Sequence, residues 1–171
     1  MTVAITIRAA RTPEDIDDVR QLCWEYRDYL LAFDDYMQEI VNVFYPEDAY
    51  TALMKDLALK HARPQGEILI AALDGQSVGC AMMHPLNDQD VEIKRVFVQA
   101  QARGTGAGEK LSQALIDQAR RDGAKRILLD TNASFTGARR LYEKLGFQQR
   151  APYSDIPEAV LPMLVFYELK L

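Results

Sequence analysis

The sequence predicts an α+β protein with a mixed, mostly antiparallel central sheet and helices on both faces. Two observations predict this class. Residues 67–83 have the pattern of a β-hairpin around Asp74-Gly75, and further along the chain apolar strands alternate with amphipathic helices, which indicates strand-helix-strand crossovers. The chain has 171 residues and is 49% hydrophobic, enough for one continuous core. We therefore expect a single domain over residues 1–171.

The first part of the chain is expected to contain one strand and then helices. Residues 3–8 alternate between apolar and polar side chains, as in a strand. Thr12 supplies a capping hydroxyl, and a proline and acidic residues follow it, so a helix is predicted over 13–31. Apolar side chains at helical spacing predict further helices over 37–43 and 47–61.

The rest of the chain is expected to build most of the sheet. Strands at 67–73 and 76–83 are joined by the Asp74-Gly75 turn. The other elements predicted are a strand at 91–98, a helix at 106–121, a strand at 125–131, a helix that carries Tyr142 and ends at Gly146, a strand that starts at Phe147 and a last strand within 161–171.

Composition narrows the classes of partner. The formal net charge is −5, so we expect no nucleic acid and no anionic membrane surface as partner. No segment is long and apolar enough to span a bilayer, and the first residues lack the pattern of a signal peptide. Cys23 and Cys80 lack metal or redox spacing, so we expect two buried thiols, no metal site and a cytoplasmic location.

Residues 96–111 run from an apolar strand, through closely spaced glycines, directly into a helix. Backbone N–H groups without side chains beside them then meet a helix N-terminus, where the helix dipole favours negative charge. An arginine at the edge of this turn adds a cation. The pattern predicts a pyrophosphate site formed by Arg103, Gly104, Thr105, Gly106, Ala107, Gly108 and Glu109.

Spacing argues against two other glycine-rich sites. A nucleotide P-loop requires Gly-Lys-Ser/Thr, but Lys110 is preceded by Glu109 and followed by Leu111. A dinucleotide fingerprint requires a third glycine three residues after the second, where this chain has Glu109 or Leu111. The remaining pattern is Arg103-x-x-Gly106-x-Gly108, and the alternative to a pyrophosphate site is a tight turn without a ligand.

This pattern resembles the Arg/Gln-x-x-Gly-x-Gly/Ala signature with which GNAT N-acetyltransferases hold the pyrophosphate of acetyl-CoA. Residues 138–147, Ala-Arg-Arg-Leu-Tyr-Glu-Lys-Leu-Gly-Phe, resemble the second signature of that superfamily, whose tyrosine stands beside the cofactor sulfur. The order of elements resembles the GNAT fold along nearly the whole chain, although the specific motifs lie within 91–147. The resemblance implies a GNAT acyl-CoA N-acyltransferase fold with acetyl-CoA as cosubstrate.

The resemblance also implies roles for individual residues. Glu92 stands where the histone-modifying members have a general base, and the alternative is a charged strand patch in which Glu92 pairs with Lys94. Tyr142 is the candidate acid for the departing CoA thiolate, and the alternative is a packed aromatic residue. A backbone N–H freed by a bulge or splay would bind the thioester oxygen. The main chain expected to bond the pantetheine arm is that of Val96, Phe97 and Val98.

One position departs from the family pattern. Many members have an asparagine seven residues before the tyrosine, where it contacts the cofactor. This chain has Phe135 there, and Asn132 lies three residues too early. One polar contact to CoA is therefore not expected, while the glycine turn does not depend on it.

The acceptor is less well determined by the sequence. In this fold it is usually held between the first two helices and the loop before the last strand, and aromatic residues gather in both regions here, as core packing or as ligand contacts. They are Tyr26, Tyr29, Phe33, Tyr36, Phe44, Tyr45 and Tyr153. The acids Asp34, Asp35 and Glu39 either attract a cationic amine or form a solvated helix face. His61 and His84 show no partner pattern.

The expected function is acetyl transfer from acetyl-CoA to a primary amine of a small molecule or amino acid, by direct attack with a general base and acid. One alternative is a protein lysine or N-terminal acetyltransferase, which an open groove would favour. The other is a non-catalytic acyl-CoA-binding module. Homodimers are common in the resembling family, so a homodimer is a further expectation.

Overall fold

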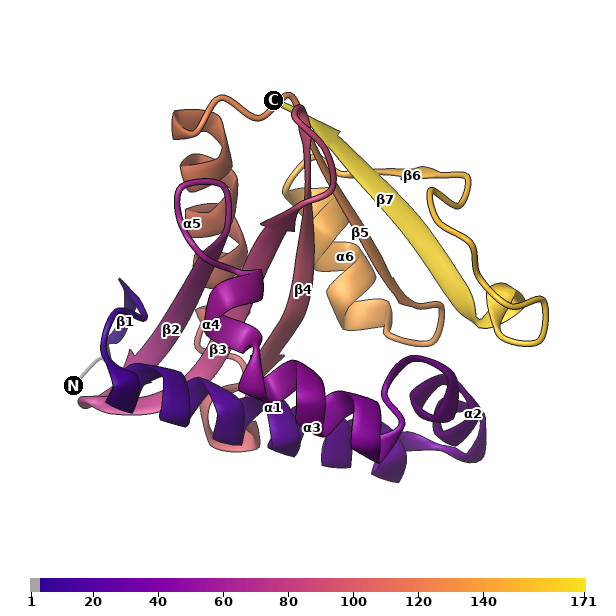
Figure 1. Cartoon of the computed structure of the whole chain (residues 1–171), viewed down its shortest axis with the longest axis horizontal. Coiled ribbons are helices and arrows are strands. Elements are labelled where there is room, and N and C mark those ends of the chain that lie inside the picture. The colour runs from indigo at the N-terminus through magenta and orange to yellow at the C-terminus, as the bar shows by residue number, and fades with distance from the viewer. Residues whose placement is uncertain (1–3) are drawn as a thin grey trace.

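Seven strands form one sheet in the order β1-β2-β3-β4-β5-β7-β6 in the computed structural model, which describes residues 4–171 (Figure 1). Neighbouring strands are antiparallel except β4 and β5, which are parallel. The strands are β1 (Ile5–Ala9), β2 (Glu67–Leu73), β3 (Gln76–Pro85), β4 (Asp90–Val98), β5 (Arg126–Asn132), β6 (Gln148–Arg150) and β7 (Leu164–Lys170). The mixed, mostly antiparallel sheet is confirmed. Val3, predicted in the first strand, lies outside the described residues.

Helices cover both faces of the sheet, as predicted. They are α1 (Pro13–Phe33), α2 (Asp35–Phe44), α3 (Glu47–Lys55), α4 (Leu57–Lys60), α5 (Ala107–Arg121) and α6 (Thr136–Lys144), with 3-10 turns η1 (Ala100–Ala102) and η2 (Leu161–Met163). One face packs against α1, α3 and α4 through a buried cluster that includes Leu22, Tyr50 and Ile70. The other packs against α5 and α6 through a cluster that includes Leu115 and Tyr167.

Most predicted bounds lie within about two residues of those observed, and two elements differ more. The helix expected over 47–61 is divided at Asp56, which ends α3 and starts α4 with φ −94° and ψ 6°; aspartate is a weak helix former. The last strand begins at Leu164 because Pro162 lies in η2 and has no N–H for a strand ladder. The hairpin is confirmed: Asp74 and Gly75 have φ of 49° and 83°, the left-handed pair of a tight two-residue turn.

The start of α1 is held by a capping box. The backbone N–H of Asp15 donates to the Thr12 hydroxyl at 3.1 Å, and the backbone N–H of Thr12 donates to the Asp15 carboxylate at 3.1 Å. Arg8 and the backbone N–H of Arg11 also bind this carboxylate, and these hydrogen bonds hold the pKa of Asp15 well below its usual range. The junction of β1 and α1 is therefore fixed by local polar contacts.

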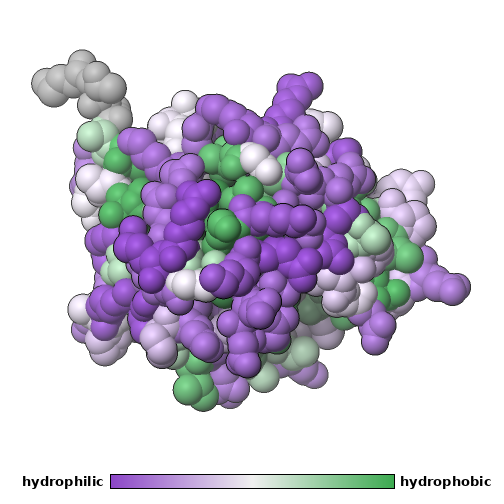
Figure 2. All heavy atoms as spheres, turned by 90° about the horizontal axis from the view of Figure 1, so that it is seen from above, coloured by the Kyte–Doolittle hydropathy of each residue, from purple (hydrophilic) through white to green (hydrophobic). Residues whose placement is uncertain are grey.

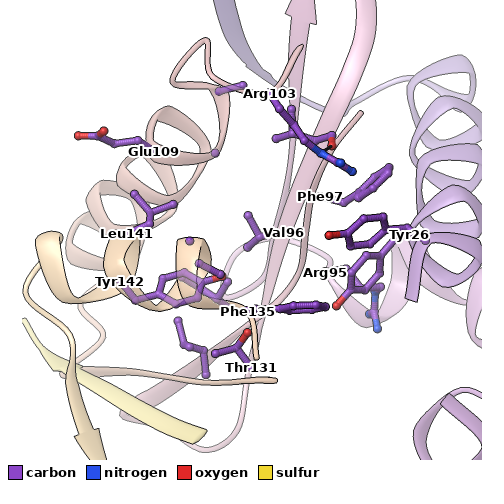
Figure 3. Close-up of a pocket in the computed structure, with 18 of the residues that line it drawn as sticks. Tyr26, Arg95, Val96, Phe97, Arg103, Glu109, Thr131, Phe135, Leu141 and Tyr142 are labelled. Atoms are coloured by element: carbon purple, nitrogen blue, oxygen red, sulfur yellow. Dashed lines mark hydrogen bonds between the residues drawn. The ribbon is translucent and has the colours of Figure 1, made fainter. Parts of the chain in front are cut away.

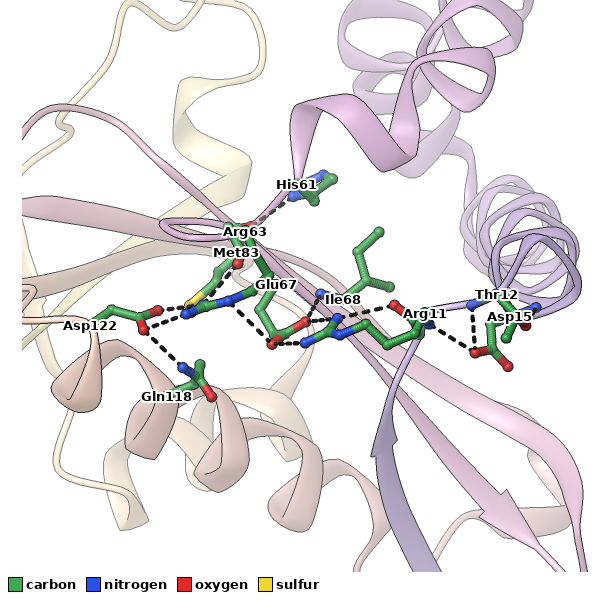
Figure 4. A network of polar contacts seen from close by, with 12 residues as sticks. Arg11, Thr12, Asp15, His61, Arg63, Glu67, Ile68, Met83, Gln118 and Asp122 are labelled. Atoms are coloured by element: carbon green, nitrogen blue, oxygen red, sulfur yellow. Dashed lines mark hydrogen bonds and ion pairs between the residues drawn. The ribbon is translucent and has the colours of Figure 1, made fainter.

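A second polar network ties the segment between α4 and β2 to neighbouring elements (Figure 4). Arg11 donates to both oxygens of the buried Glu67 carboxylate, at 2.7 and 2.8 Å. Arg63 donates to Asp122 beyond the end of α5, at 2.5 and 2.6 Å. Nδ1 of His61 lies 2.9 Å from the backbone oxygen of Met83 in β3, so His61 is held against the sheet.

Hydrophilic side chains cover most of the face seen in Figure 2, with small separate apolar areas between them. This agrees with a chain whose charged residues make up 26% of the sequence. Among residues 4–171, no helix has the length and apolar character needed to cross a bilayer.

The capping box gives a stability prediction. Thr12→Ala removes the hydroxyl that caps α1, and we expect the free energy of unfolding in urea to fall by about 1 kcal/mol. Thr51→Ala is the matched control, because the Thr51 hydroxyl is exposed and bonds only the preceding turn of α3. Equal losses in the two variants would contradict the role assigned to Thr12.

Candidate active site

The central feature of the site is the separation of β4 from β5. The two parallel strands pair at only three positions, Asp90 with Arg126, Val91 with Ile127 and Glu92 with Leu128. Beyond them β4 continues against β3, and β5 continues against β7. Backbone groups on the facing edges of β4 and β5 therefore lose their strand partner, as expected for the splay that the sequence suggested.

A β-bulge in β4 lies where the strands separate. Cys80 of β3 pairs with Phe97 and Met82 pairs with Lys94, so two β4 residues face one β3 residue. The bulge contains Arg95, whose φ of 51° is unusual for a residue with a side chain. A bulge of this kind leaves backbone polar groups outside the ladder, where they can bind another oxygen.

The opening leads into a cavity of about 720 Å³. Its wall includes β4 from Ile93 to Val98, the end of β5, the glycine turn, α6 and part of α1. Figure 3 shows Leu141 and Tyr142 on one side of this cavity and Tyr26 and Arg95 on the other. The structure thus brings together the two motifs that are far apart in the sequence.

The glycine turn has the geometry that an anion cradle requires. Gly104 and Gly106 have φ of 79° and 83°, and a Cβ placed on either would meet no atom within 4 Å. Gly106 is also the N-cap of α5, without a side chain to cap the helix, so the first N–H groups of α5 are available to a ligand. This open, positively polarised turn fits a pyrophosphate.

Most of the predicted pyrophosphate residues line the cavity, namely Arg103, Gly104, Gly106, Ala107, Gly108 and Glu109. Thr105 does not, and its hydroxyl donates to the Ala102 carbonyl at 2.6 Å. Arg103 donates to the Val98 carbonyl at 3.2 Å, and its guanidinium lies 4.7 Å from the ring centre of Tyr29. The strand residues Val96, Phe97 and Val98 also line the cavity.

Tyr142 lies in the cavity wall and is otherwise buried. Its ring packs against Phe147 and Tyr167, with ring centres 5.7 and 6.2 Å away. Burial raises the pKa of the Tyr142 phenol, so it keeps its proton at neutral pH. The residue is both a packed aromatic and a donor that faces the cavity.

Glu92 lines a neighbouring cavity of about 570 Å³ rather than the main one. Its carboxylate lies 2.8 Å from Nε2 of His84, accepts a hydrogen bond of 2.5 Å from the Tyr153 hydroxyl and lies 3.7 Å from Nζ of Lys94. Burial opposes the charge, but the hydrogen bond from His84, the charge of Lys94 and the bond from Tyr153 lower the Glu92 pKa to about 2. Glu92 is therefore an anion at neutral pH.

Asp130 was not singled out by the sequence, yet it joins the cavities. Its side chain lines the main cavity, the Glu92 cavity and a third cavity of about 210 Å³. The Tyr153 hydroxyl lies 3.4 Å from Asp130, and Nζ of Lys94 lies 3.8 Å from it. Burial raises the pKa of Asp130 despite the charge of Lys94. An acid at the end of a strand was its only sequence signal.

The candidate acceptor residues separate into two groups. Tyr26, Tyr29, Phe33 and Tyr45 line the main cavity, Phe44 lines the two smaller ones and Tyr153 lines the Glu92 cavity. Phe135, which replaces the family's asparagine, packs edge-to-face on Phe33 with ring centres 4.8 Å apart. Tyr36 is 67% exposed. No described cavity is lined by the acids Asp34, Asp35 and Glu39, and Asp34 caps α2.

The cysteines and histidines have structural surroundings. Cys23 and Cys80 are buried and free, as expected. His61, to which the sequence assigned no partner, accepts a hydrogen bond from Arg95, and burial lowers its pKa to about 3. In the part of the chain from residue 4 onward, no group of three or more metal-ligating side chains is close enough together to hold a metal ion.

Comparisons with known proteins agree with this geometry. Residues 20–147 match the model of the Acetyltransferase (GNAT) family. The chain belongs to this family. It is 28% identical to an uncharacterized N-acetyltransferase of Schizosaccharomyces pombe over 98% of this chain and 95% of that protein, and 35% identical to IAA acetyltransferase of Azospirillum brasilense over 63% of this chain and 69% of that protein.

The fold matches a structure of yncA from Salmonella typhimurium with its cofactor acetyl-CoA. The TM-score is 0.66 at 22% identity, over 98% of this chain and 94% of that one. The GNAT fold expected from the sequence is therefore confirmed, and the chain is an acyltransferase by family. The roles of individual residues remain predictions.

The glycine turn gives a binding prediction. Gly106→Asp places a side chain and a negative charge where the pyrophosphate would lie, so we expect acetyl-CoA affinity in calorimetry to fall roughly 100-fold. Gly123→Asp is the matched control, because Gly123 has the same φ of 83° and equally open surroundings but lies beyond the other end of α5. Unchanged affinity in a folded Gly106 variant would refute the cradle.

Proposed function

We propose that this protein transfers an acetyl group from acetyl-CoA to a primary amine of a small molecule. The observation that carries the proposal is the cavity between the separated β4 and β5, which has the glycine turn at one end and Tyr142 and Asp130 in its wall. The comparison with yncA, whose structure holds acetyl-CoA, supports the donor. Acetyl-CoA supplies the acetyl group as a thioester.

The glycine turn and β4 would hold the donor. N–H groups of the turn and of the first turn of α5 would bind the pyrophosphate, with Arg103 moving from Tyr29 to add a charge-assisted hydrogen bond. The free edge of β4 at Val96–Val98 would bond the pantetheine arm like an added strand. Backbone groups of the bulge at Arg95 would stabilise the charge that develops on the thioester oxygen.

Asp130 and Glu92 would assist the removal of a proton from the amine. The attacking nitrogen forms a bond to the carbonyl carbon, and the bond from that carbon to sulfur breaks. An amine that arrives protonated loses two protons in all, one before the attack and one as the amide forms; the sulfur gains one proton and the other passes to solvent. Asp130, whose pKa is raised by burial, would accept the first proton. Tyr153 connects Asp130 to Glu92, so Glu92 would act through this hydroxyl rather than by touching the amine.

Tyr142 would protonate the leaving group. It holds its phenolic proton because burial raises its pKa, and it faces the cavity that would hold the thioester. A CoA thiolate has a conjugate thiol of pKa about 8.5 in water, so a nearby hydroxyl donor stabilises its departure. The third cavity, whose wall includes residues of α1, α2, β4 and β5, has a volume of only about 210 Å³, which favours a small acceptor over an extended peptide.

The proposal is tested by release of free CoA thiol over an unbiased panel of amines, together with equilibrium binding of acetyl-CoA. Turnover of a small amine is expected. Binding of acetyl-CoA without turnover of any small amine would overturn the proposal, and turnover of peptides alone would favour the protein-acetylating alternative.

Tyr142→Phe keeps the packed ring and removes the proton donor. We expect kcat to fall roughly 100-fold, with the affinity for acetyl-CoA within about twofold of the parent protein, since the main-chain grip is unaffected. Tyr36→Phe is the matched control, because Tyr36 lines none of the described cavities. A Tyr142 variant with the parent kcat would remove the phenol from the mechanism.

Glu92→Gln should give a deficit that depends on pH. Glu92 is ionised above its pKa of about 2, so throughout the range of assay the variant loses the negative charge that would act on Asp130 through Tyr153. We expect kcat/KM to fall roughly 100-fold near pH 7, with a smaller deficit as pH rises, because more of the amine then arrives without its proton. The control is Glu158→Gln at an exposed position. A profile parallel to that of the parent would exclude Glu92 from proton transfer.

A further inference from the structure

Arg95 is a buried cation at the boundary of two cavities. The residue is only 5% exposed, yet it lines both the main cavity and the third cavity. Its Nη2 donates to Nε2 of His61 at 2.9 Å, and its Nε lies 3.3 Å from the sulfur of Met82. Both partners are neutral, because the pKa of His61 is lowered by burial to about 3 and a thioether carries no charge.

Other arginines held in polar networks each bind a carboxylate, and within the described part of the chain Arg95 does not. Arg11 binds the Glu67 carboxylate, Arg63 binds Asp122 and Arg126 binds Asp90. Over residues 4–171, no aspartate or glutamate forms an ion pair with Arg95. Burying a guanidinium without an anion beside it costs free energy. A bound anion would offset this cost at Arg95.

Two lysines increase the positive charge around the third cavity. Lys60 and Lys94 line this cavity together with Arg95. The acidic residue in the cavity wall is Asp130. Lys94 lies between Glu92 and Asp130, at 3.7 and 3.8 Å, and neither acid forms an ion pair with Arg95. Desolvation and the charges of Arg95 and Lys94 lower the pKa of Lys60, while the charge of Glu92 opposes them.

The rest of the third cavity is mainly apolar and aromatic. Its volume is about 210 Å³, and its wall includes Tyr26, Leu30, Met37, Ile40, Phe44 and Phe135. A molecule that fits would combine a compact apolar or aromatic body with one anionic group. To be acetylated it must also present an amine toward the bulge of β4 and Asp130, which lie where this cavity meets the main one.

We propose that Arg95, assisted by Lys60 at the rim, binds the carboxylate of the acceptor, so that the acceptor is a free amino acid with an apolar or aromatic side chain. This inference rests on the proposed acetyl transfer and specifies its substrate class. The carboxylate lies on Arg95, the side chain lies against α1 and α2, and the α-amine points toward Asp130 and the cavity that receives the thioester. A bidentate guanidinium-carboxylate pair fixes orientation as well as supplying affinity.

The test compares amino acids with their amides, which keep the amine and side chain and lose the anion. L-leucine and L-phenylalanine are assayed beside leucinamide and phenylalaninamide by CoA thiol release. Binding of the same four compounds is measured by calorimetry in the presence of CoA. The parent protein is expected to favour the carboxylates roughly 10- to 100-fold in both readouts.

Substitutions test which residues produce the preference for carboxylates. Arg95→Met should remove most of it, and Arg95→Lys should keep part of it because the charge remains. Lys60→Met is the second variant, placed on an exposed side chain at the end of α4, and it should lower the preference several-fold even if the Arg95 variants fail to fold. Lys55→Met is its matched control, because Lys55 lies on the exposed surface of α3 away from all three cavities.

The outcomes separate this inference from the proposed function. Equal use of carboxylates and amides by the parent protein would overturn the carboxylate site and leave acetyl transfer standing. Selective binding of carboxylates without turnover of any amine would keep the site and overturn acetyl transfer. A preference that survives both Lys60→Met and Arg95→Met would place the carboxylate elsewhere and overturn the assignment.

Discussion

The separation of β4 from β5 is the constraint on which the rest of the site depends. A parallel pair is normally paired along its length, but here it ends after Glu92 and Leu128. The strands remain ordered because each keeps its other neighbour, β3 or β7, and because buried clusters cover both faces of the sheet. The sheet therefore provides an open polar edge inside a well-packed protein, and the opening requires no flexible loop.

The polar groups near this opening differ in how completely they are satisfied. The Glu92 carboxylate is surrounded by donors and is fixed as an anion, whereas Asp130 is closer to the exchange of a proton because its pKa is raised. Arg95 carries a charge that no acidic residue from 4 to 171 matches by an ion pair. A polar group whose hydrogen bonds are all made within the protein can hold its neighbours in place. A charged group that lacks a partner of opposite charge in the protein is available to pair with a substrate.

The sequence predicted the fold, and it predicted a glycine turn at the start of a helix, because both rest on local patterns. The Asp74-Gly75 turn, the Thr12 cap and the glycine turn each depend on a few adjacent residues. Asp130, Arg95 and His61 could not be recognised in the same way, because their roles arise from strand register and from burial. His84 and Tyr153 meet at Glu92 only through the pairing of β3 with β4 and the path of the loop before β7.

Main-chain groups would recognise the donor, whereas side chains would recognise the acceptor. The glycine turn and the edge of β4 present main-chain groups, whereas the third cavity is built from side chains of α1, α2, β4 and β5. A grip made of peptide groups tolerates replacement of the surrounding side chains. New acceptor preferences can therefore arise by exchange of a few wall residues while the donor grip is inherited unchanged, which makes this scaffold readily evolvable.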